Sequence, residues 1–264
     1  GKRLRPVLAL LTAQLGDPAL ATGEQIRDAG VAVELTHIAT LYHDDVMDEA
    51  PLRRGAPSAQ IVWGNSAAIL TGDVLVARAS QLVAALSPEA VMAHAKTFER
   101  LCMGQLHETL PRPAGTDPVD HYIQVLADKT GSLIAVSARY GAMLTGAGAA
   151  TERIVEEFGE KIGVAFQLAD DVIDLASDSQ TTGKTPGTDL REGVDTMPVL
   201  LLRKALAAGE LDAAGQAILS RLSTGNLNDD AVLADVAARL RLHPVLARTR
   251  EMAMTWAREA VGVL

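Results

Sequence analysis

Residues 151–175 read TERIVEEFGEKIGVAFQLADDVIDL and contain no proline. Apolar side chains recur along this stretch at the intervals of an α-helix, and they are Val164, Leu168, Val172 and Leu175. Polar side chains form a second row, made of Gln167, Asp170, Asp171 and Asp174. The stretch therefore predicts a long amphipathic helix that packs on one side and carries carboxylates on the other.

The surrounding sequence extends this helical pattern over the whole chain. No proline occurs from 119 to 185, and this segment divides near Gly146-Ala147-Gly148, which predicts two long helices. Further helices are expected over 65–86 and 88–110, each bounded by a proline or a turn signal. Because no linker, repeat or low-complexity tract interrupts the pattern, we expect one all-α domain over residues 1–264.

Composition excludes several other classes of protein. The chain has 264 residues, of which 48% are hydrophobic and only 3% aromatic, so an aliphatic core is expected and a β-sandwich or barrel is disfavoured. A net charge of −9 argues against a nucleic-acid binder, and a single cysteine rules out an intrachain disulfide framework and a cysteine-based zinc site. No apolar run approaches the ~18 residues of a membrane span, and no signal peptide opens the chain. We therefore expect a cytoplasmic protein.

A cluster of acidic residues closes the first long helix. We expect this helix to begin at Thr22, with Gln25 three residues later as in a capping box, and to end in HDDVMDE at 43–49. Asp44 and Asp48 are four positions apart, so their carboxylates share one face at a helix end whose dipole is already negative. A hard cation such as Mg²⁺ would relieve this repulsion, and a solvated acidic helix end is the simple alternative.

The same pattern recurs at Asp170, Asp171 and Asp174. Two such clusters in an apolar helical chain favour a cage for several cations much more than one cluster does. The segment GKTPGTD at 183–189 is expected to be a flexible loop that carries Lys184. It is not a P-loop, because the leading glycine of that motif and the preceding strand are both absent.

Basic side chains near the first cluster and on a later helix have both a plain and a functional interpretation. His37 precedes the first cluster by about two helical turns and lies on nearly the same face. Arg53 and Arg54 follow the cluster, either as a solvated pair or as a clamp for phosphate oxygens. The pair Lys129-Thr130 interrupts an apolar helix, where a lysine usually extends to solvent.

Taken together, these motifs resemble those of the trans-isoprenyl diphosphate synthases, or polyprenyl synthetases. The resemblance covers the chain from its first residue to about Pro198 and follows the family's order of motifs. The motifs are GKRLRP (1–6), ELTHIATLYHDDVMD (34–48), RRGAP (53–57), GQ (104–105), KTG (129–131), FQLADDVID (166–174) and GKTPGTDLREG (183–193). Two departures from the family pattern are visible. The third residue of KTG is usually alanine in the family. Relatives also usually carry further residues before GK, so we expect the family's N-terminal residues to be missing here.

The resemblance implies a bundle of antiparallel helices around a deep central cavity, of the isoprenoid synthase type, usually as a homodimer. It implies condensation of isopentenyl diphosphate with an allylic diphosphate. The residues it implies for isopentenyl diphosphate are Lys2, Arg5, His37 and Arg54. Those it implies for binding and ionising the allylic diphosphate are Arg53, Gln105, Lys129, Thr130, Gln167 and Lys184. Three Mg²⁺ ions would be bound by Asp44, Asp48 and Asp170, with support from Asp45, Asp171 and Asp174.

The helix that leads to Asp44 also bears on product length. Thr40 and Ala39 stand four and five positions before Asp44, where an aromatic residue in the family implies short products. The same face continues with the mostly small side chains of Thr36, Val33, Ala32 and Ala29. This predicts a tunnel about 22 Å long and an all-trans product of about six to ten isoprene units. Close helix packing is the alternative reason for small residues, and Phe98 is a candidate for a deeper floor.

Four alternative functions remain open at this point. A geranylgeranyl or farnesyl diphosphate synthase would share every motif and differ in product length. A non-catalytic subunit of a heteromeric prenyl synthase tends to lose aspartates, whereas all six are present here. A terpene cyclase needs no isopentenyl site and usually has a different second metal motif. A structural helical protein would carry the acidic clusters as solvated surface.

Overall fold

The computed structural model describes residues 3–53, 55–176, 187–191 and 193–264. Its internal contacts divide the chain into two compact units. Unit 1 consists of Gly1–Met103, Asp128–Glu160 and Val263–Leu264, and unit 2 consists of Gly104–Ala127 and Lys161–Gly262. Within the described ranges the regular structure is helical apart from one short hairpin, so the prediction of an all-α chain is confirmed.

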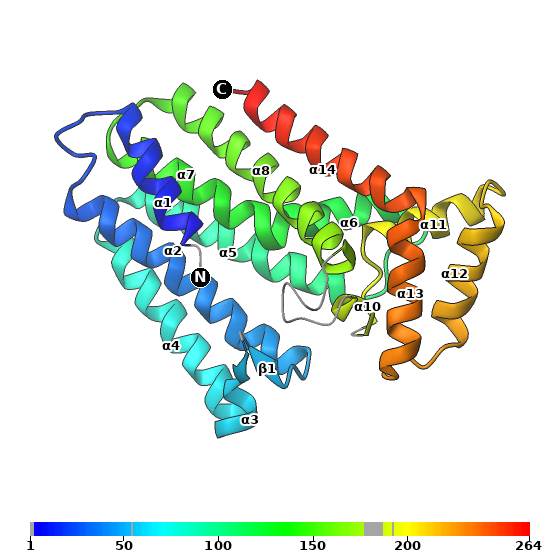
Figure 1. Cartoon of the computed structure of the whole chain (residues 1–264). Coiled ribbons are helices and arrows are strands. Elements are labelled where there is room, and N and C mark those ends of the chain that lie inside the picture. The colour runs from blue at the N-terminus through cyan, green and yellow to red at the C-terminus, as the bar shows by residue number, and fades with distance from the viewer. Residues whose placement is uncertain (1–2, 54, 177–186, 192) are drawn as a thin grey trace. The chain divides into compact units, whose positions relative to one another are not determined.

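Unit 1 is built around the long helix α2, Glu24–Met47. Helix α2 packs against α1 (Leu4–Thr12), α4 (Asn65–Ala84) and α7 (Ser132–Leu144), as can be followed in Figure 1. The other elements that contribute to this unit are the 3₁₀ turn η1 (Ala13–Leu15), strands β1 (Leu52–Arg53) and β2 (Ala56–Pro57), helix α3 (Ala59–Trp63), the first parts of α5 (Pro88–Thr109) and α8 (Ala149–Ala176), and the π-helical turn η2 (Ala127–Gly131).

Most predicted helix boundaries agree with the structure, and one cap does not. The segments 65–86 and 88–110 correspond to α4 and α5, and the glycines near 146–148 separate α7 from α8. The capping box at Thr22 is wrong, because the N-cap of α2 is Gly23 and no side chain caps this helix end. Thr22 instead accepts a hydrogen bond at its carbonyl from the Arg27 guanidinium, at 3.2 Å.

Small side chains allow α2 to pack closely against its neighbours. Ala29, Ala32 and Val33 belong to one buried cluster with side chains of α4, α5 and α7, and Phe98 packs against the same cluster. Ala29, Ala32, Val33 and Ala39 are each 0% exposed, so no open channel runs along them. The prediction that this face lines a tunnel is therefore wrong at these four positions in this structure, and close helix packing explains their size.

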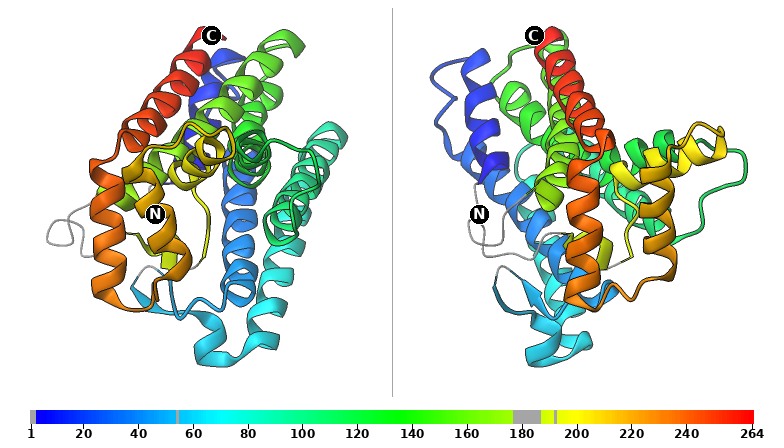
Figure 2. Two further views of the ribbon diagram at one scale, coloured as in Figure 1. Left: turned by 90° about the vertical axis from the view of Figure 1, so that its right-hand side faces the viewer. Right: turned by 45° about the vertical axis from the view of Figure 1, so that its right-hand side comes forward.

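Unit 2 has a hydrophobic core of its own, which includes Leu168, Met197, Leu233 and Leu240. Its elements are the last parts of α5 and α8, together with α6 (Pro118–Leu126), α10 (Thr188–Arg191), α11 (Met197–Ala207), α12 (Ala213–Thr224), α13 (Asp230–Leu242) and α14 (Pro244–Gly262). Figure 2 shows α12 and α13, in yellow to orange, as neighbouring helices. Aspartate side chains accept hydrogen bonds from backbone N–H groups at the starts of three of these helices, and they are Asp117, Asp212 and Asp229.

Helix α4 has an apolar exposed side. In the described part of the chain it is the one helix that is long and apolar enough to cross a membrane. A single helix of this kind is weak evidence for a membrane span, because core helices of other proteins have the same length and composition. One side of α4 packs against α2, whereas Ile69, Leu70 and Val74 are exposed. Exposed apolar side chains gathered on one helix usually mark contact with another molecule.

Candidate active site

The last turn of α2 carries the first aspartate cluster. Asp44 is half-buried, and Asp48 is the exposed C-cap residue, whose backbone N–H donates to the Asp44 carbonyl at 2.8 Å. Asp45, between them, is 4% exposed. Because Asp44 and Asp48 are one turn apart on the same face, two carboxylates of this cluster are accessible to a ligand while the third is covered.

Arg53 holds the covered carboxylate. Strands β1 and β2 form an antiparallel hairpin whose turn includes Gly55 at φ +80°, a conformation that favours glycine. Arg53 lies on this hairpin, and its Nε donates to Asp45 Oδ1 at 2.7 Å, with a second contact from Nη2. The pair compensates one of the negative charges at the C-terminal end of α2.

A contact that the sequence does not reveal joins the first cluster to α4. The Nε2 atom of His43 lies 3.3 Å from Asp73 Oδ1 and 3.2 Å from the Ile69 carbonyl oxygen. A β-carbon on Gly72 would stand 2.3 Å from the same Nε2 atom, so glycine is required for the ring to pack here. His43 thereby fixes the backbone immediately before Asp44.

Helix α1 places a half-buried cation, Arg5, beside α2. Burial holds the pKa of the Arg5 guanidinium below its usual value, although the negative charge of Glu34 on α2 acts in the opposite direction. The Nε atom of Arg5 has no hydrogen-bond partner among the residues that the structure describes, which leaves a buried donor for an anionic ligand. His37 lies one turn beyond Glu34 on α2 and is half-buried.

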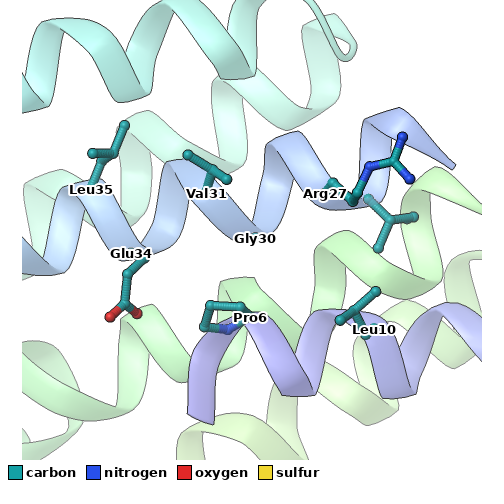
Figure 3. Close-up of a pocket in the computed structure, with 8 residues that line it drawn as sticks. Pro6, Leu10, Arg27, Gly30, Val31, Glu34 and Leu35 are labelled. Atoms are coloured by element: carbon teal, nitrogen blue, oxygen red, sulfur yellow. The ribbon is translucent and has the colours of Figure 1, made fainter. Parts of the chain in front are cut away.

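The surface groove between α1 and α2 is a different kind of site (Figure 3). Pro6 and Leu10 on α1 and Gly30 and Val31 on α2 are among the residues that line this groove, whose volume is about 400 Å³, and Pro6 lies close to Gly30. Arg27 and Glu34 are the only charged side chains among the described residues that line it. Because a diphosphate needs several cationic or N–H donors, this groove does not suit one.

The second aspartate cluster lies near the end of α8. Asp171 is 1% exposed, and the Tyr122 hydroxyl donates to its two carboxylate oxygens at 3.0 and 3.1 Å. The backbone N–H of Met197 donates to the same carboxylate at 3.1 Å. Burial raises the pKa of Asp171 to about 7, although the hydrogen bonds from Met197 and Tyr122 act in the opposite direction. As in the first cluster, the middle carboxylate is covered and held, while Asp170 is exposed and Asp174 is half-buried.

Asp174 also anchors the chain that follows α8. Its Oδ1 atom accepts the backbone N–H of Thr188 at 3.2 Å, and its carbonyl accepts the N–H of Gly187 at 3.1 Å. Gln167 lies two turns earlier on α8 and is half-buried. The predicted site residues Lys2, Arg54 and Lys184 lie outside the described residues.

Lys129 and Thr130 lie in η2, a single turn of π-helix, and both are half-buried. Such turns are rare in proteins, and those that occur are frequently found at functional sites.

Gln105 lies on α5, and its buried Oε1 atom accepts no hydrogen bond from the part of the chain that is described. An orphaned acceptor of this kind fits a ligand that donates or a water that bridges.

The predicted residues are thus divided between the two units. Unit 1 contains Arg5, His37, Asp44, Asp45, Asp48, Arg53, Lys129 and Thr130. Unit 2 contains Gln105, Gln167, Asp170, Asp171 and Asp174. Within each unit, no three described His, Cys, Asp or Glu side chains converge as a complete set of metal ligands. The accessible carboxylates still fit a hard divalent cation, which prefers such oxygens and completes its shell with water.

Comparison with known proteins identifies the family of this chain. Residues 1–226 match the family described as polyprenyl synthetase. The nonaprenyl diphosphate synthase of Mycobacterium tuberculosis is 45% identical over 260 residues, which cover 98% of this chain and 75% of that protein. The crystal structure of a heptaprenyl diphosphate synthase from Staphylococcus aureus superimposes with a TM-score of 0.85 at 27% identity and covers 100% of this chain and 80% of that one.

A further solved structure contains ligands. It is a geranylgeranyl pyrophosphate synthase from Corynebacterium glutamicum complexed with calcium and isoprenyl diphosphate, 41% identical, with a TM-score of 0.82 and coverage of 100% of this chain and 79% of that one. The fold is therefore that of an isoprenoid synthase. The chain belongs to the polyprenyl synthetase family and is a prenyltransferase.

Proposed function

We propose that the protein condenses isopentenyl diphosphate with an allylic diphosphate, in the presence of Mg²⁺, to form an all-trans polyprenyl diphosphate. One observation carries this proposal. Both aspartate clusters have the same organisation, in which the middle carboxylate is buried and bonded, Asp45 to Arg53 and Asp171 to Tyr122, while the first aspartate of each motif remains accessible. A merely solvated acidic helix end would need no such support.

Metal binding is assigned to the accessible carboxylates. Asp44, Asp48 and Asp170 would hold three Mg²⁺ ions, and Asp174 would support Asp170 from one turn further along α8. When bound, the ions would act as Lewis acids and stabilise the negative charge on the departing diphosphate. The relative that was crystallised with calcium and isoprenyl diphosphate supports a divalent metal in this role.

Diphosphate binding is assigned to the basic and polar residues. The buried, unpartnered Nε atom of Arg5 supports a role in binding isopentenyl diphosphate, together with Lys2, His37 and Arg54. The residues proposed for the allylic diphosphate are Arg53, Gln105, Lys129, Thr130, Gln167 and Lys184. Arg53 would act there while it also neutralises Asp45, since a guanidinium has five N–H donors in a planar fork.

The chemistry requires charge stabilisation rather than a nucleophilic side chain. Breaking the allylic C–O bond leaves the bonding electron pair on the diphosphate and a delocalised cation on the carbon chain. Carbonyl dipoles of Gln167 and of the turn at Lys129 would stabilise the cation, and apolar walls would exclude water that could convert it to an alcohol. The isopentenyl double bond then forms the new C–C bond, and the proton that is lost goes to the departing diphosphate.

Product length is the finer part of the proposal. A long chain of about six to ten isoprene units, at ~5 carbons each, is supported by the 45% identity to a nonaprenyl diphosphate synthase. A geranylgeranyl product is the second candidate, since a relative of that name is 41% identical and the small side chains of α2 leave no open channel.

The assembly is proposed to be a homodimer in the cytoplasm, with both units of each chain forming one catalytic domain. The exposed apolar side chains of α3 and α4 support a protein–protein contact, and the most exposed of them are Trp63, Val74 and Leu70, with Trp63 69% exposed. Sedimentation equilibrium would measure the mass of the assembly. A Leu70→Glu variant should shift it from dimer to monomer, and a wild-type monomer would contradict the proposal.

The direct test of the reaction uses the full chain with radiolabelled isopentenyl diphosphate, farnesyl diphosphate and Mg²⁺. Reversed-phase chromatography of the dephosphorylated products should show a ladder that ends at about six to ten units, and a chelator should abolish it. A ladder that ends at four units favours the geranylgeranyl product. Absence of any incorporation would contradict the proposed reaction.

A further inference from the structure

Three charged side chains of unit 1 meet next to the π-helical turn. The Nε atom of Arg100, on α5, donates to Asp128 Oδ1 at 2.7 Å. The Nη1 atom of the same guanidinium contacts Glu160 Oε2, on α8. Asp128 is the second residue of η2 and directly precedes Lys129 and Thr130.

The carboxylate that Arg100 holds is buried. Asp128 is only 6% exposed, so its charge has little water around it and depends on a charged partner. Burial by itself would lower the pKa of Arg100, but the hydrogen bonds that Arg100 donates to Glu160 and Asp128, together with the negative charges of these carboxylates, outweigh it and raise the pKa above its usual value. The guanidinium therefore remains charged and ties the turn to two other helices.

The backbone on both sides of this contact is fixed as well. The Ser132 hydroxyl donates to the carbonyl oxygen of Asp128 at 2.5 Å. A β-carbon on Gly131 would stand 3.0 Å from the Glu160 carbonyl oxygen, so the turn and α8 approach closely only because this residue is glycine. One residue earlier on α8, a β-carbon on Gly159 already meets the backbone of α7, at 2.7 Å from the Ala135 Cα. The backbone of α8 at Glu160 is therefore held in place by close packing against α7 and the π-helical turn.

We propose that Arg100, Asp128 and Glu160 form a charge-paired clamp that holds the π-helical turn and so positions Lys129 and Thr130 for the transfer reaction. An ordinary α-helix rotates by about 100° per residue, so loss of the extra residue of a π turn would reorient both side chains and their carbonyls. The inference rests on the proposed function only for the role of Lys129 and Thr130. The clamp residues themselves are positioning residues.

Arg139 provides a matched control in the same unit. It lies on α7 and bridges two carboxylates of α8, Glu152 at 3.5 Å and Glu156 at 3.3 Å. Its side chain is 31% exposed, compared with 36% for Arg100. The two arginines therefore make similar ion pairs, but only Arg100 holds the π turn.

The test compares Arg100→Gln, Asp128→Asn and Arg139→Gln in steady-state kinetics of the full chain. Arg100→Gln and Asp128→Asn should each lower kcat by about 10- to 100-fold with little change in the KM for isopentenyl diphosphate, because misplacement of about 1 Å has effects of this size. The double variant should be no worse than either single variant, and Arg100→Lys should recover part of the loss. Arg139→Gln should keep kcat within about twofold of the wild-type value. It should lower the melting temperature by about as much as Arg100→Gln does.

Hydrogen exchange separates this inference from the proposed function. Backbone amides of residues 128–132 should exchange at least about tenfold faster in Arg100→Gln than in the wild type. Their exchange rates should be unchanged in Arg139→Gln. An equal loss of kcat in the two arginine variants, or unchanged exchange in Arg100→Gln, would overturn the clamp. A wild-type protein without synthase activity would overturn the proposed reaction, while the exchange measurement would still decide whether the clamp exists.

Discussion

The hydrogen bond between Tyr122 and Asp171 predicts a pH-dependent loss of stability in a single variant. Tyr122→Phe removes a donor from a carboxylate that is 1% exposed, without changing the shape of the ring. A hydrogen bond to a buried charge contributes about 2 kcal/mol to the free energy of unfolding, roughly twice a neutral one. Tyr140→Phe is the matched control, because the buried Tyr140 hydroxyl donates to the neutral Ala90 carbonyl at 3.2 Å, and its removal should cost about 1 kcal/mol.

The sign of the pH effect follows from the raised pKa of Asp171. That pKa rises from 3.8 to about 7 on folding, so the folded protein holds a proton that the unfolded chain has lost, and stability from this group falls as the pH rises through that window. The tyrosine favours the ionised form, so the cost of Tyr122→Phe should be larger at about pH 8.5 than at about pH 5.5. Tyr140→Phe should cost the same at both.

Urea unfolding followed by circular dichroism, in a chelator, measures both costs. With chelator present, no metal on neighbouring carboxylates contributes to the result. If the two variants lose the same free energy at both pH values, the Tyr122 hydroxyl does not stabilise a buried charge and the description of the second cluster is wrong.

Three further outcomes are expected. Gly72→Ala should destabilise the protein by about 1–3 kcal/mol, because its β-carbon would overlap the His43 ring, and a melting temperature equal to that of the wild type would contradict this contact. Burial lowers the pKa of His94, so below about pH 6.5 the unfolded chain takes up a proton more readily than the folded protein, and stability decreases as the pH decreases. In urea titrations His94→Gln should make this decrease in stability smaller. A decrease as large as that of the wild type would show that another group causes it. Thr40→Phe, one turn before Asp44, should shorten the product to about three or four units on chromatography, and an unaltered ladder would show that Thr40 does not face the growing chain.

Helix positions could be predicted from the sequence because proline and glycine act locally. The ends of α4 and α5 lie within a few positions of a following proline, and the break between α7 and α8 lies at two glycines. The π turn at Ala127–Gly131 could not be predicted, because the shift of one residue in the apolar pattern falls within a single turn and does not stand out from the irregular spacing of apolar residues along a helix. The division of the chain into two compact units likewise has no signal in composition.

Chemistry at the site could be predicted in kind but not in partnership. The repeated aspartate spacing identifies both clusters, yet the pairing of Asp45 with Arg53 depends on a hairpin that folds back onto α2. Small residues on α2 were ambiguous between a tunnel wall and close packing, and only their full burial decides for packing at Ala29 and Ala39. Sequence spacing reports which face a residue occupies, whereas the neighbour of that face is a tertiary property.

The requirement for both aspartate clusters in one reaction is the central claim, and the turnover of two isosteric variants tests it most directly. Asp44→Asn and Asp170→Asn should each lower kcat by about 10³-fold at saturating Mg²⁺, because each removes a charge that holds the metal at the departing diphosphate. Asp120→Asn, at an exposed position on α6, should keep the wild-type rate within about twofold and controls for an amide at a surface aspartate. Undiminished turnover in either Asp44→Asn or Asp170→Asn, with folding intact by circular dichroism, would contradict the account.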